Sequence, residues 1–203
     1  MSPPKFEIPV YKEQLNAALN GGDVACFQLR LKDQPKDFIR QACEELMPLV
    51  QSNDVAFLVN DDPEIAAEMG ADGVHVGQED TPYKQARNIV GEEAIVGVTC
   101  HNSRHLAMVA AEAGADYVAF GAFYPTQTKT PKTTAELDLL QWWSALAETP
   151  VVAIGGITVD NAAPLVKSGA DFLAVSGGVW NHPEGPEKAV QELNSVIDQV
   201  HKT

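Results

Sequence analysis

Three polar side chains alternate with leucines along one short segment of the sequence. Gln28, Arg30 and Lys32 are separated by Leu29 and Leu31. In a β-strand this alternation places the polar residues on one face and the leucines on the other. A buried cation without a partner is costly, so Arg30 and Lys32 are expected to meet an anion. That anion is either a bound ligand or the carboxylates of an internal ion-pair network.

Two acidic clusters follow predicted strands. Residues 60–62 (Asn-Asp-Asp) end one apolar run, and residues 78–80 (Gln-Glu-Asp) come just after the next. Carboxylates that converge at neighbouring strand ends suit Mg²⁺, which prefers oxygen ligands and keeps several waters for substrate phosphates. Each cluster alone would be explained as a loop or helix-capping carboxylate. Their pairing on adjacent strands is what favours a metal site.

Three later segments have the composition of phosphate-binding loops. Residues 125–129 (Pro-Thr-Gln-Thr-Lys) offer two hydroxyls and an ammonium as donors. Residues 155–157 (Gly-Gly-Ile) and 175–178 (Val-Ser-Gly-Gly) close the last two predicted strands, and their glycines let backbone amides approach a phosphate. The alternatives are a threonine-rich mobile loop and two tight turns. Parallel barrels usually bind phosphate after their last two strands, which favours the binding interpretation.

The histidines carry less information. His75 lies between Val74 and Val76 in a predicted strand. We expect it to line the barrel as an internally hydrogen-bonded side chain rather than to act as a catalytic base. His101 and His105 have a spacing that would allow metal binding, but capping or surface positions are the simpler expectation.

A repeat identifies the elements that must position these residues. Gly-Ala-Asp occurs at 70–72, 114–116 and 169–171, each time between a helix-like segment and a short apolar run. A glycine just past a helix supplies its left-handed cap, and the run that follows is too short for another helix. Repeated helix–turn–strand units imply parallel strands joined by crossover helices. We therefore predict an α/β fold, a TIM (β/α)8-type parallel barrel, with its chemistry on the loops that leave the strands.

The barrel has no obvious first strand. The predicted strands are 26–31, 55–60, 73–77, 95–99, 117–123, 151–155 and 172–176, and the predicted helices include 11–19, 36–50, 64–69, 103–113, 134–147, 159–167 and 186–200. The pattern counts eight helices, one of them without assigned bounds, against seven strands, because residues 1–9, with three prolines, supply no strand. Either the chain starts late relative to its relatives or an irregular segment closes the barrel. An unfilled gap would expose two strand edges and favour association.

Composition limits the class of protein. The 203 residues are predicted to form one domain, 1–203, large enough for its own core. A net charge of −14 argues against nucleic-acid and anionic-membrane partners. No apolar run approaches the about 18 residues of a membrane span, and the N-terminus does not read as a signal peptide. The three widely spaced cysteines are expected to be reduced, so we predict a cytoplasmic location.

Together these motifs resemble the thiamine phosphate synthase family over about residues 14–197. The matching motifs are Gln-Leu-Arg-x-Lys at 28–32, Asn-Asp at 60–61, Gly-Ala-Asp-Gly-Val-His-x-Gly-Gln-Glu-Asp at 70–80, Pro-Thr-x-Thr-Lys at 125–129 and Ala-Ile-Gly-Gly-Ile at 153–157. The 70–80 match and the threonine-lysine loop are specific. Gly-Gly-Ile alone recurs in many phosphate-binding barrels.

The resemblance implies a transferase that couples hydroxymethylpyrimidine diphosphate to a thiazole phosphate and releases pyrophosphate through a carbocation-like step. It implies Mg²⁺ held by Asp61 and Asp80. The residues that would stabilise charge on the departing pyrophosphate are Arg30, Lys32 and Lys129. Those that would hold the pyrimidine diphosphate are Gln28, Arg30, Lys32, Asn60, Thr99 and Lys129. Those that would hold the thiazole phosphate are Thr126, Thr128, Gly156, Val175 and Ser176.

The chain departs from the family pattern at three points. The first strand is absent, which bears on folding and on whether a homodimer forms. Asp62 stands where arginine is common, so a third carboxylate is expected either near the metal or facing solvent. Thr99 replaces the more usual serine and adds a methyl group beside the pyrimidine.

Three other functions fit parts of the pattern. A related thiazole tautomerase, an isomerase on the same barrel, shares the last two phosphate loops but not the Asn-Asp pair. A catalytically silent paralogue would bind the thiazole phosphate or thiamine phosphate without turnover. A sugar-phosphate isomerase would use the glycine loops but would give no joint role to Asp61 and Asp80.

Overall fold

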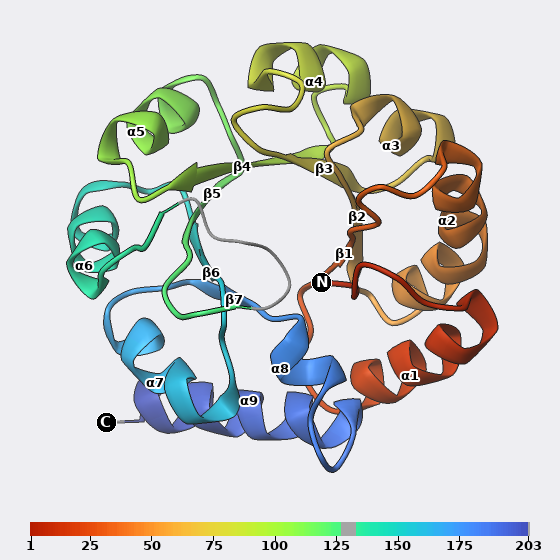
Figure 1. Ribbon diagram of the computed structural model, residues 1–203. Coiled ribbons are helices and arrows are strands. Elements are labelled where there is room, and N and C mark those ends of the chain that lie inside the picture. Colours follow the sequence, from red (N-terminus) through yellow and green to blue (C-terminus); the bar gives the residue numbers. More distant parts are fainter. Residues whose placement is uncertain (127–132, 203) are drawn as a thin grey trace.

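Seven parallel strands follow one another in chain order around a curved sheet whose outer face is covered by helices (Figure 1). This computed structural model describes residues 1–126 and 133–202. The strands are β1 (Cys26–Leu29), β2 (Ala56–Asn60), β3 (Gly73–Val76), β4 (Ile95–His101), β5 (Tyr117–Gly121), β6 (Val151–Ile154) and β7 (Phe172–Ala174). The seven predicted strands are confirmed, and only their ends differ.

The helices form the outer ring in Figure 1. They are α1 (Ile8–Asn20), α2 (Lys36–Gln51), α3 (Pro63–Met69), α4 (Tyr83–Val90), α5 (Arg104–Glu112), α6 (Leu137–Leu146), α7 (Val159–Lys167), α8 (Gly177–Trp180) and α9 (Pro186–His201). α4 and α8 are not among the helices whose bounds the sequence pattern gave. In α4 only Ala86 is buried, and α8 is one turn that opens with two glycines, so each is short and buries few side chains. No described helix is long and apolar enough to cross a membrane.

An irregular segment, Met1 and Ser2, fills the gap between β7 and β1. The Ser2 amide donates to the Gln28 carbonyl at 2.9 Å, and its hydroxyl accepts from the Arg30 amide at 2.8 Å. On the other side, the Met1 nitrogen donates to the Val175 carbonyl at 3.1 Å. Of the two predicted arrangements, closure by an irregular segment is therefore the one observed. Met1 and Ser2 thus occupy the gap where these contacts lie, at the carboxyl ends of β1 and β7.

The Gly-Ala-Asp repeat has a structural role at the amino ends of the strands. In each copy the aspartate carboxylate accepts a hydrogen bond of 2.7–2.8 Å from a backbone amide in the preceding strand, and its own amide donates to the carbonyl of that same residue. The pairs are Asp72 with Phe57, Asp116 with Val96, and Asp171 with Val151. The repeat thus fastens β3, β5 and β7 to their neighbours and leaves the opposite, carboxyl ends for the site.

The core lies between the sheet and the helix ring. Leu29 and Leu31 are 1% and 5% exposed, as the alternation predicted, and they pack with apolar side chains of the helices. The same alternation in β5 buries Val118 and Phe120 completely and leaves Tyr117 facing the barrel interior. In each strand, burial of the side chains that face the helices therefore fixes which residues point toward the barrel axis.

Candidate active site

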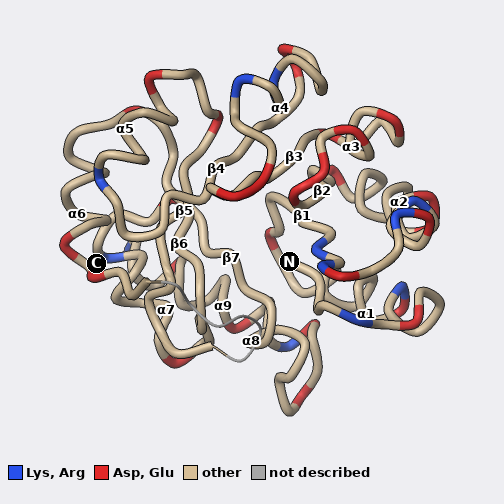
Figure 2. The backbone as a smooth tube through the Cα atoms, turned by 45° about the horizontal axis from the view of Figure 1, so that its top comes forward, with Lys and Arg blue, Asp and Glu red and all other residues tan. Residues whose placement is uncertain are grey.

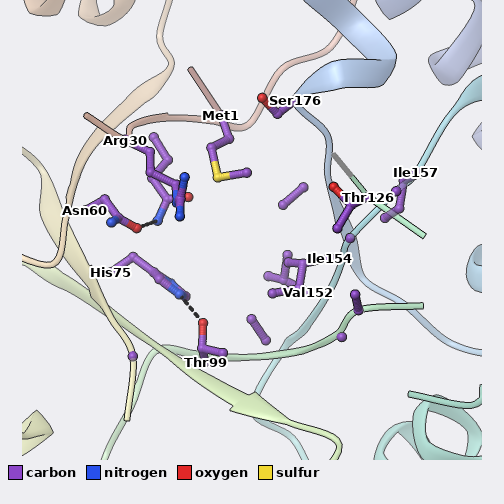
Figure 3. A pocket seen from close by; sticks show the side chains of 18 of the residues that line it. Met1, Arg30, Asn60, His75, Thr99, Thr126, Val152, Ile154, Ile157 and Ser176 are labelled. Atoms are coloured by element: carbon purple, nitrogen blue, oxygen red, sulfur yellow. Dashed lines mark hydrogen bonds between the residues drawn. The ribbon is translucent and has the colours of Figure 1, made fainter. Parts of the chain in front are cut away.

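A cavity of about 450 Å³ lies at the carboxyl ends of the strands (Figure 3). The predicted site residues that line it are Gln28, Arg30, Lys32, Asn60, Asp61, Asp80, Thr99, Thr126, Gly156 and Ser176. Of the predicted residues within the described ranges, only Val175 does not line the cavity, because its side chain belongs to the core and its carbonyl accepts from Met1. Thr128 and Lys129 lie outside the described residues. The barrel therefore brings together residues that are up to 148 positions apart, Gln28 and Ser176.

The cationic side of the cavity is formed by Arg30 and Lys32, which follow β1. Arg30 is 8% exposed, and burial lowers its pKa while the carboxylates of Asp61, Asp33 and Asp80 oppose that effect. The Lys32 ammonium lies 2.9 Å from the Asp61 carboxylate. The internal ion-pair network is thus observed in part. Figure 2 shows this alternation of charge, basic on the segment after β1 and acidic on the loops after β2 and β3.

Asp61 and Asp80 form the acidic pair. Asp61 adopts a left-handed φ of 69°, and its amide donates to the His75 carbonyl at 2.8 Å. Its carboxyl is within hydrogen-bonding reach of Asp80. Burial, first, and the Asp80 charge raise the pKa of Asp61, against the opposing effect of Lys32. Two adjacent, partly desolvated carboxylates repel each other, and this is a donor pair that a divalent cation would stabilise.

The position of Asp80 depends on Gly77. The Gly77 amide donates to Asp80 Oδ2 at 2.8 Å, and a Cβ on Gly77 would lie 2.8 Å from that same oxygen. A side chain at 77 would therefore displace the carboxylate. Within the described residues there is no group of three or more His, Cys, Asp or Glu side chains able to hold a metal. A Mg²⁺ here would take its remaining ligands from water and substrate phosphate, as is usual for this ion.

Asp62 is not part of the acidic pair. Its carboxylate caps α3 by accepting from the Ile65 amide at 3.0 Å, and it pairs with the Lys36 ammonium at 2.8 Å. Burial by itself would raise the pKa of Asp62. The contacts with Lys36 and with the Ile65 amide outweigh burial, so the pKa is lowered. Asp62 is absent from the cavity wall. Asp62 therefore neither joins Asp61 and Asp80 nor faces solvent freely, the two positions expected for it: its carboxylate is half-buried between the amino end of α3 and Lys36.

The floor of the cavity holds neutral polar groups. The Gln28 amide donates to the Asn60 side-chain oxygen at 3.1 Å. His75 is 8% exposed, and its ring nitrogens contact the hydroxyls of Tyr117 and Thr99. The expectation of an internally hydrogen-bonded His75 is confirmed. His101 also lines the cavity, which differs from its expected surface or capping position, whereas His105 is exposed.

The opposite wall is built from glycine-rich backbone. Gly155 and Gly156 have φ values of 97° and 66°, in the left-handed region that favours glycine. A Cβ on Gly156 would lie 2.4 Å from the Pro125 carbonyl oxygen. These glycines therefore allow the loops after β5 and β6 to pack against each other beside the cavity. Ser176 completes this wall, and its hydroxyl donates to the Ser2 carbonyl at 3.2 Å.

Sequence reasoning did not assign several residues of the cavity wall, among them Met1, Gly77, Gln78, His101 and Tyr117. Gly77 and Gln78 lie in the 70–80 motif, so position in that motif was an available signal. For Tyr117 the available signal was its alternation with Val118 along β5. Met1 had none, because its place depends on barrel closure.

Comparisons with known proteins show the family to which this chain belongs. Residues 8–179 match the family model described as thiamine monophosphate synthase. The thiamine-phosphate synthase of Rhodospirillum centenum is 64% identical over 197 residues, which cover 97% of this chain and 95% of that protein. The enzyme of the same name from Hyphomonas neptunium is 50% identical and covers 98% of this chain and 93% of its own length.

Solved structures give the same result. Thiamine phosphate pyrophosphorylase from Pyrococcus furiosus superposes with a TM-score of 0.85 at 33% identity, covering 97% of this chain and 92% of that one. Orotidine 5'-phosphate decarboxylase from Pyrococcus horikoshii superposes with a TM-score of 0.68 at 15% identity, which shows a shared fold alone.

Proposed function

Because the chain belongs to the thiamine monophosphate synthase family, whose relatives named above are transferases, we propose that it joins hydroxymethylpyrimidine diphosphate to a thiazole phosphate. The products are thiamine phosphate and pyrophosphate. The observation that carries this proposal is the division of one cavity into two walls. Arg30, Lys32, Asp61 and Asp80 lie on one wall, and the glycine-rich backbone of Gly156 lies on the other. Two phosphorylated substrates fit such an arrangement.

The diphosphate is proposed to bind at the cationic wall. Arg30 and Lys32 would donate to its oxygens and stabilise the charge that grows as the bond to the pyrimidine methylene breaks. Lys129, which the sequence assigns to the same task, lies outside the described residues. Gln28 and Asn60, already joined by a hydrogen bond, would contact the pyrimidine. Asp61 and Asp80 would hold Mg²⁺, which supplies further neutralisation of the pyrophosphate when bound.

The thiazole phosphate is proposed to bind at the opposite wall. Ser176 and Thr126 would donate hydroxyl hydrogens to the phosphate, and Gly156 would let the backbone approach it. Val175 would contribute through its backbone, since its side chain lies in the core. Thr128 keeps its proposed role from the sequence.

The reaction follows from holding the two substrates in line. When the carbon–oxygen bond breaks, its electron pair leaves with pyrophosphate, and the electron-rich pyrimidine ring stabilises the methylene cation. The thiazole nitrogen then supplies the electron pair of the new carbon–nitrogen bond. This nitrogen carries no proton, so no general base is needed. The contribution of the protein is orientation and charge stabilisation.

The Lys32–Asp61 ion pair must rearrange for this reaction. The Lys32 ammonium and the Asp61 carboxylate lie 2.9 Å apart and neutralise each other. Arrival of a diphosphate gives Lys32 an anionic partner, and arrival of a divalent cation gives Asp61 a cationic one. The two ligands would therefore favour each other's binding, because either alone leaves one member of the pair uncompensated.

The test is formation of thiamine phosphate from both substrates, measured with Mg²⁺ and with excess chelator. Turnover that chelator removes supports the synthase. A thiazole tautomerase would instead isomerise the thiazole alone and be indifferent to chelator. Binding of the thiazole phosphate without either reaction would indicate a silent paralogue.

We also propose that the protein is located in the cytoplasm and that it can form a homodimer. The buried free thiols of Cys43 and Cys100 are consistent with a reducing compartment. Light scattering of the purified protein decides the oligomeric state.

A further inference from the structure

Three side chains form a hydrogen-bonded chain that ends in the cavity. Tyr117 contacts His75 Nδ1 at 2.8 Å, and Thr99 Oγ1 contacts His75 Nε2 at 2.7 Å. Figure 3 shows the second of these contacts, with His75 and Thr99 on the same side of the cavity. The three residues come from β3, β5 and β4, so neighbouring strands hold each member of the chain.

The barrel interior is shaped to accommodate this arrangement. A Cβ on Gly97 would lie 1.9 Å from the Tyr117 Cζ atom, so the phenol occupies space that any other residue at 97 would fill. The Tyr117 and His75 rings stack with centroids 5.5 Å apart and planes 21° apart. Thr99 is β-branched, which restricts its χ1 and fixes the position of its hydroxyl oxygen. Geometry thus leaves only the hydrogen positions to be decided.

The phenol decides them. Burial raises the pKa of Tyr117 well above its ordinary value, so the hydroxyl keeps its proton. Within the described part of the chain, His75 is the hydrogen-bond partner that the phenol oxygen has. If His75 Nδ1 carried a proton, the phenol would have to accept from it, and the phenol hydrogen would be left without an acceptor among the residues that the structure describes. A buried donor without an acceptor is costly.

The order of donors follows from this. The phenol donates to Nδ1, which must then be the unprotonated nitrogen of the ring. The ring proton lies on Nε2 and is donated to Thr99 Oγ1. Because that oxygen now accepts from His75, its own hydrogen is turned away from the imidazole and is available to a group in the cavity.

We propose that Tyr117 and His75 are positioning residues that fix the Thr99 hydroxyl as a hydrogen-bond donor toward an acceptor ring nitrogen of the bound pyrimidine. The identity of the acceptor rests on the proposed function. A pyrimidine ring carries nitrogen lone pairs, and a hydroxyl fixed as a donor prefers such an atom over an amino or methyl group. The methyl group that distinguishes Thr99 from serine then adds rigidity to the donor.

The first half of the proposal is tested in the ligand-free protein. Nitrogen-15 NMR of labelled histidine distinguishes the two neutral tautomers, and the resonance missing from a His75→Gln variant identifies His75. We expect the proton on Nε2. A proton on Nδ1, or on both nitrogens, would overturn the proposal. This readout needs neither substrate nor turnover, so it stands even if the synthase proposal fails.

The second half is tested by a double-mutant cycle with hydroxymethylpyrimidine diphosphate as the probe, its dissociation constant measured by calorimetry. Tyr117→Phe keeps the stacked ring and removes only the hydroxyl, and Thr99→Val removes the donor itself. We expect each to weaken binding roughly 3- to 10-fold, the worth of one hydrogen bond. In the Thr99→Val background, Tyr117→Phe should have no further effect.

Tyr83→Phe is the matched control, since its hydroxyl donates to the Gly114 carbonyl outside the cavity. Its affinity for the probe should equal that of the wild type. Additive losses for Tyr117→Phe and Thr99→Val would show that the tyrosine does not act through Thr99. If the wild-type protein fails to bind the probe, the proposed function and the second half fail together, while the tautomer still decides the first half.

Discussion

Gly77→Ala is the most discriminating test of the proposed metal site. Gly77 has no positive φ, so alanine fits the backbone without strain. The added Cβ would lie 2.8 Å from Asp80 Oδ2, and among the described residues beyond its two chain neighbours the one further atom within 4 Å is Cγ of the same side chain, at 3.9 Å. Ordinary contact begins near 3.4 Å, so the carboxylate oxygen must move by about 0.6 Å. The perturbation is thus confined to one proposed ligand.

The expected effect falls on metal affinity more than on stability. Mg²⁺ requires near-octahedral ligands at about 2.0–2.1 Å, so a shift of this size cannot be absorbed. Loss of a group that orients a ligand typically costs about 10- to 100-fold in metal affinity. The Mg²⁺ concentration for half-maximal thiamine phosphate formation should rise by that factor. Alanine makes the unfolded chain less flexible than glycine does, which stabilises the folded protein by about 0.4–1 kcal/mol. This gain offsets part of the free energy of unfolding that is lost with the hydrogen bond from the residue 77 amide to Asp80.

Gly73→Ala, at the other end of β3, is the contrasting variant. Its Cβ would lie 2.0 Å from the Ile95 carbonyl oxygen, which belongs to the backbone of β4 and cannot move aside. It should lower the melting temperature and leave the Mg²⁺ requirement of the remaining folded enzyme unchanged. A folded Gly77→Ala protein with the wild-type Mg²⁺ requirement would refute the role assigned to Asp80.

Three further predictions follow from the described contacts. Asp62→Ala should destabilise the protein by about 1 kcal/mol through loss of the α3 cap, with an unchanged Mg²⁺ requirement; a raised requirement would return Asp62 to the metal site. Gly156→Ala, at φ 66° and 2.4 Å from a carbonyl oxygen of the loop after β5, should raise the KM for the thiazole phosphate more than that for the diphosphate, and steady-state kinetics measure both. Burial raises the pKa of Cys43 and of Cys100 to about 12, so neither should react with Ellman's reagent until denaturant is added; fast reaction in the folded protein would contradict their burial.

Local patterns predicted the elements that bury a periodic apolar face. The strands were recognisable because each is a short apolar run bounded by turn residues, and the Gly-Ala-Asp repeat marked three of their starts. The same reasoning gave no bounds for α4 and α8. α4 has eight residues and buries only Ala86, and α8 has four residues and opens with two glycines, so each buries too few side chains to stand out in the sequence.

The polar residues of the site were predictable for a related reason. Alternation places Gln28, Arg30 and Lys32 on one face, and parallel strands align their carboxyl ends, so the loops that follow must converge. What alternation could not separate was Asp61 from Asp62. Asp61 has a left-handed backbone, and Asp62, the next residue, caps α3, so only the Asp61 carboxylate lies beside Asp80.

The sequence by itself therefore determined the α/β barrel, its strand order and most of the residues of its cavity, because these depend on periodicity and on short-range turn chemistry. Only the tertiary structure decided how the barrel closes and how the Thr99 hydroxyl is oriented. Met1 meets Val175 across 174 positions, and Tyr117 meets His75 across 42. Contacts of this kind leave no signal in the local sequence, because each residue fits its own segment equally well whether or not the distant partner is present.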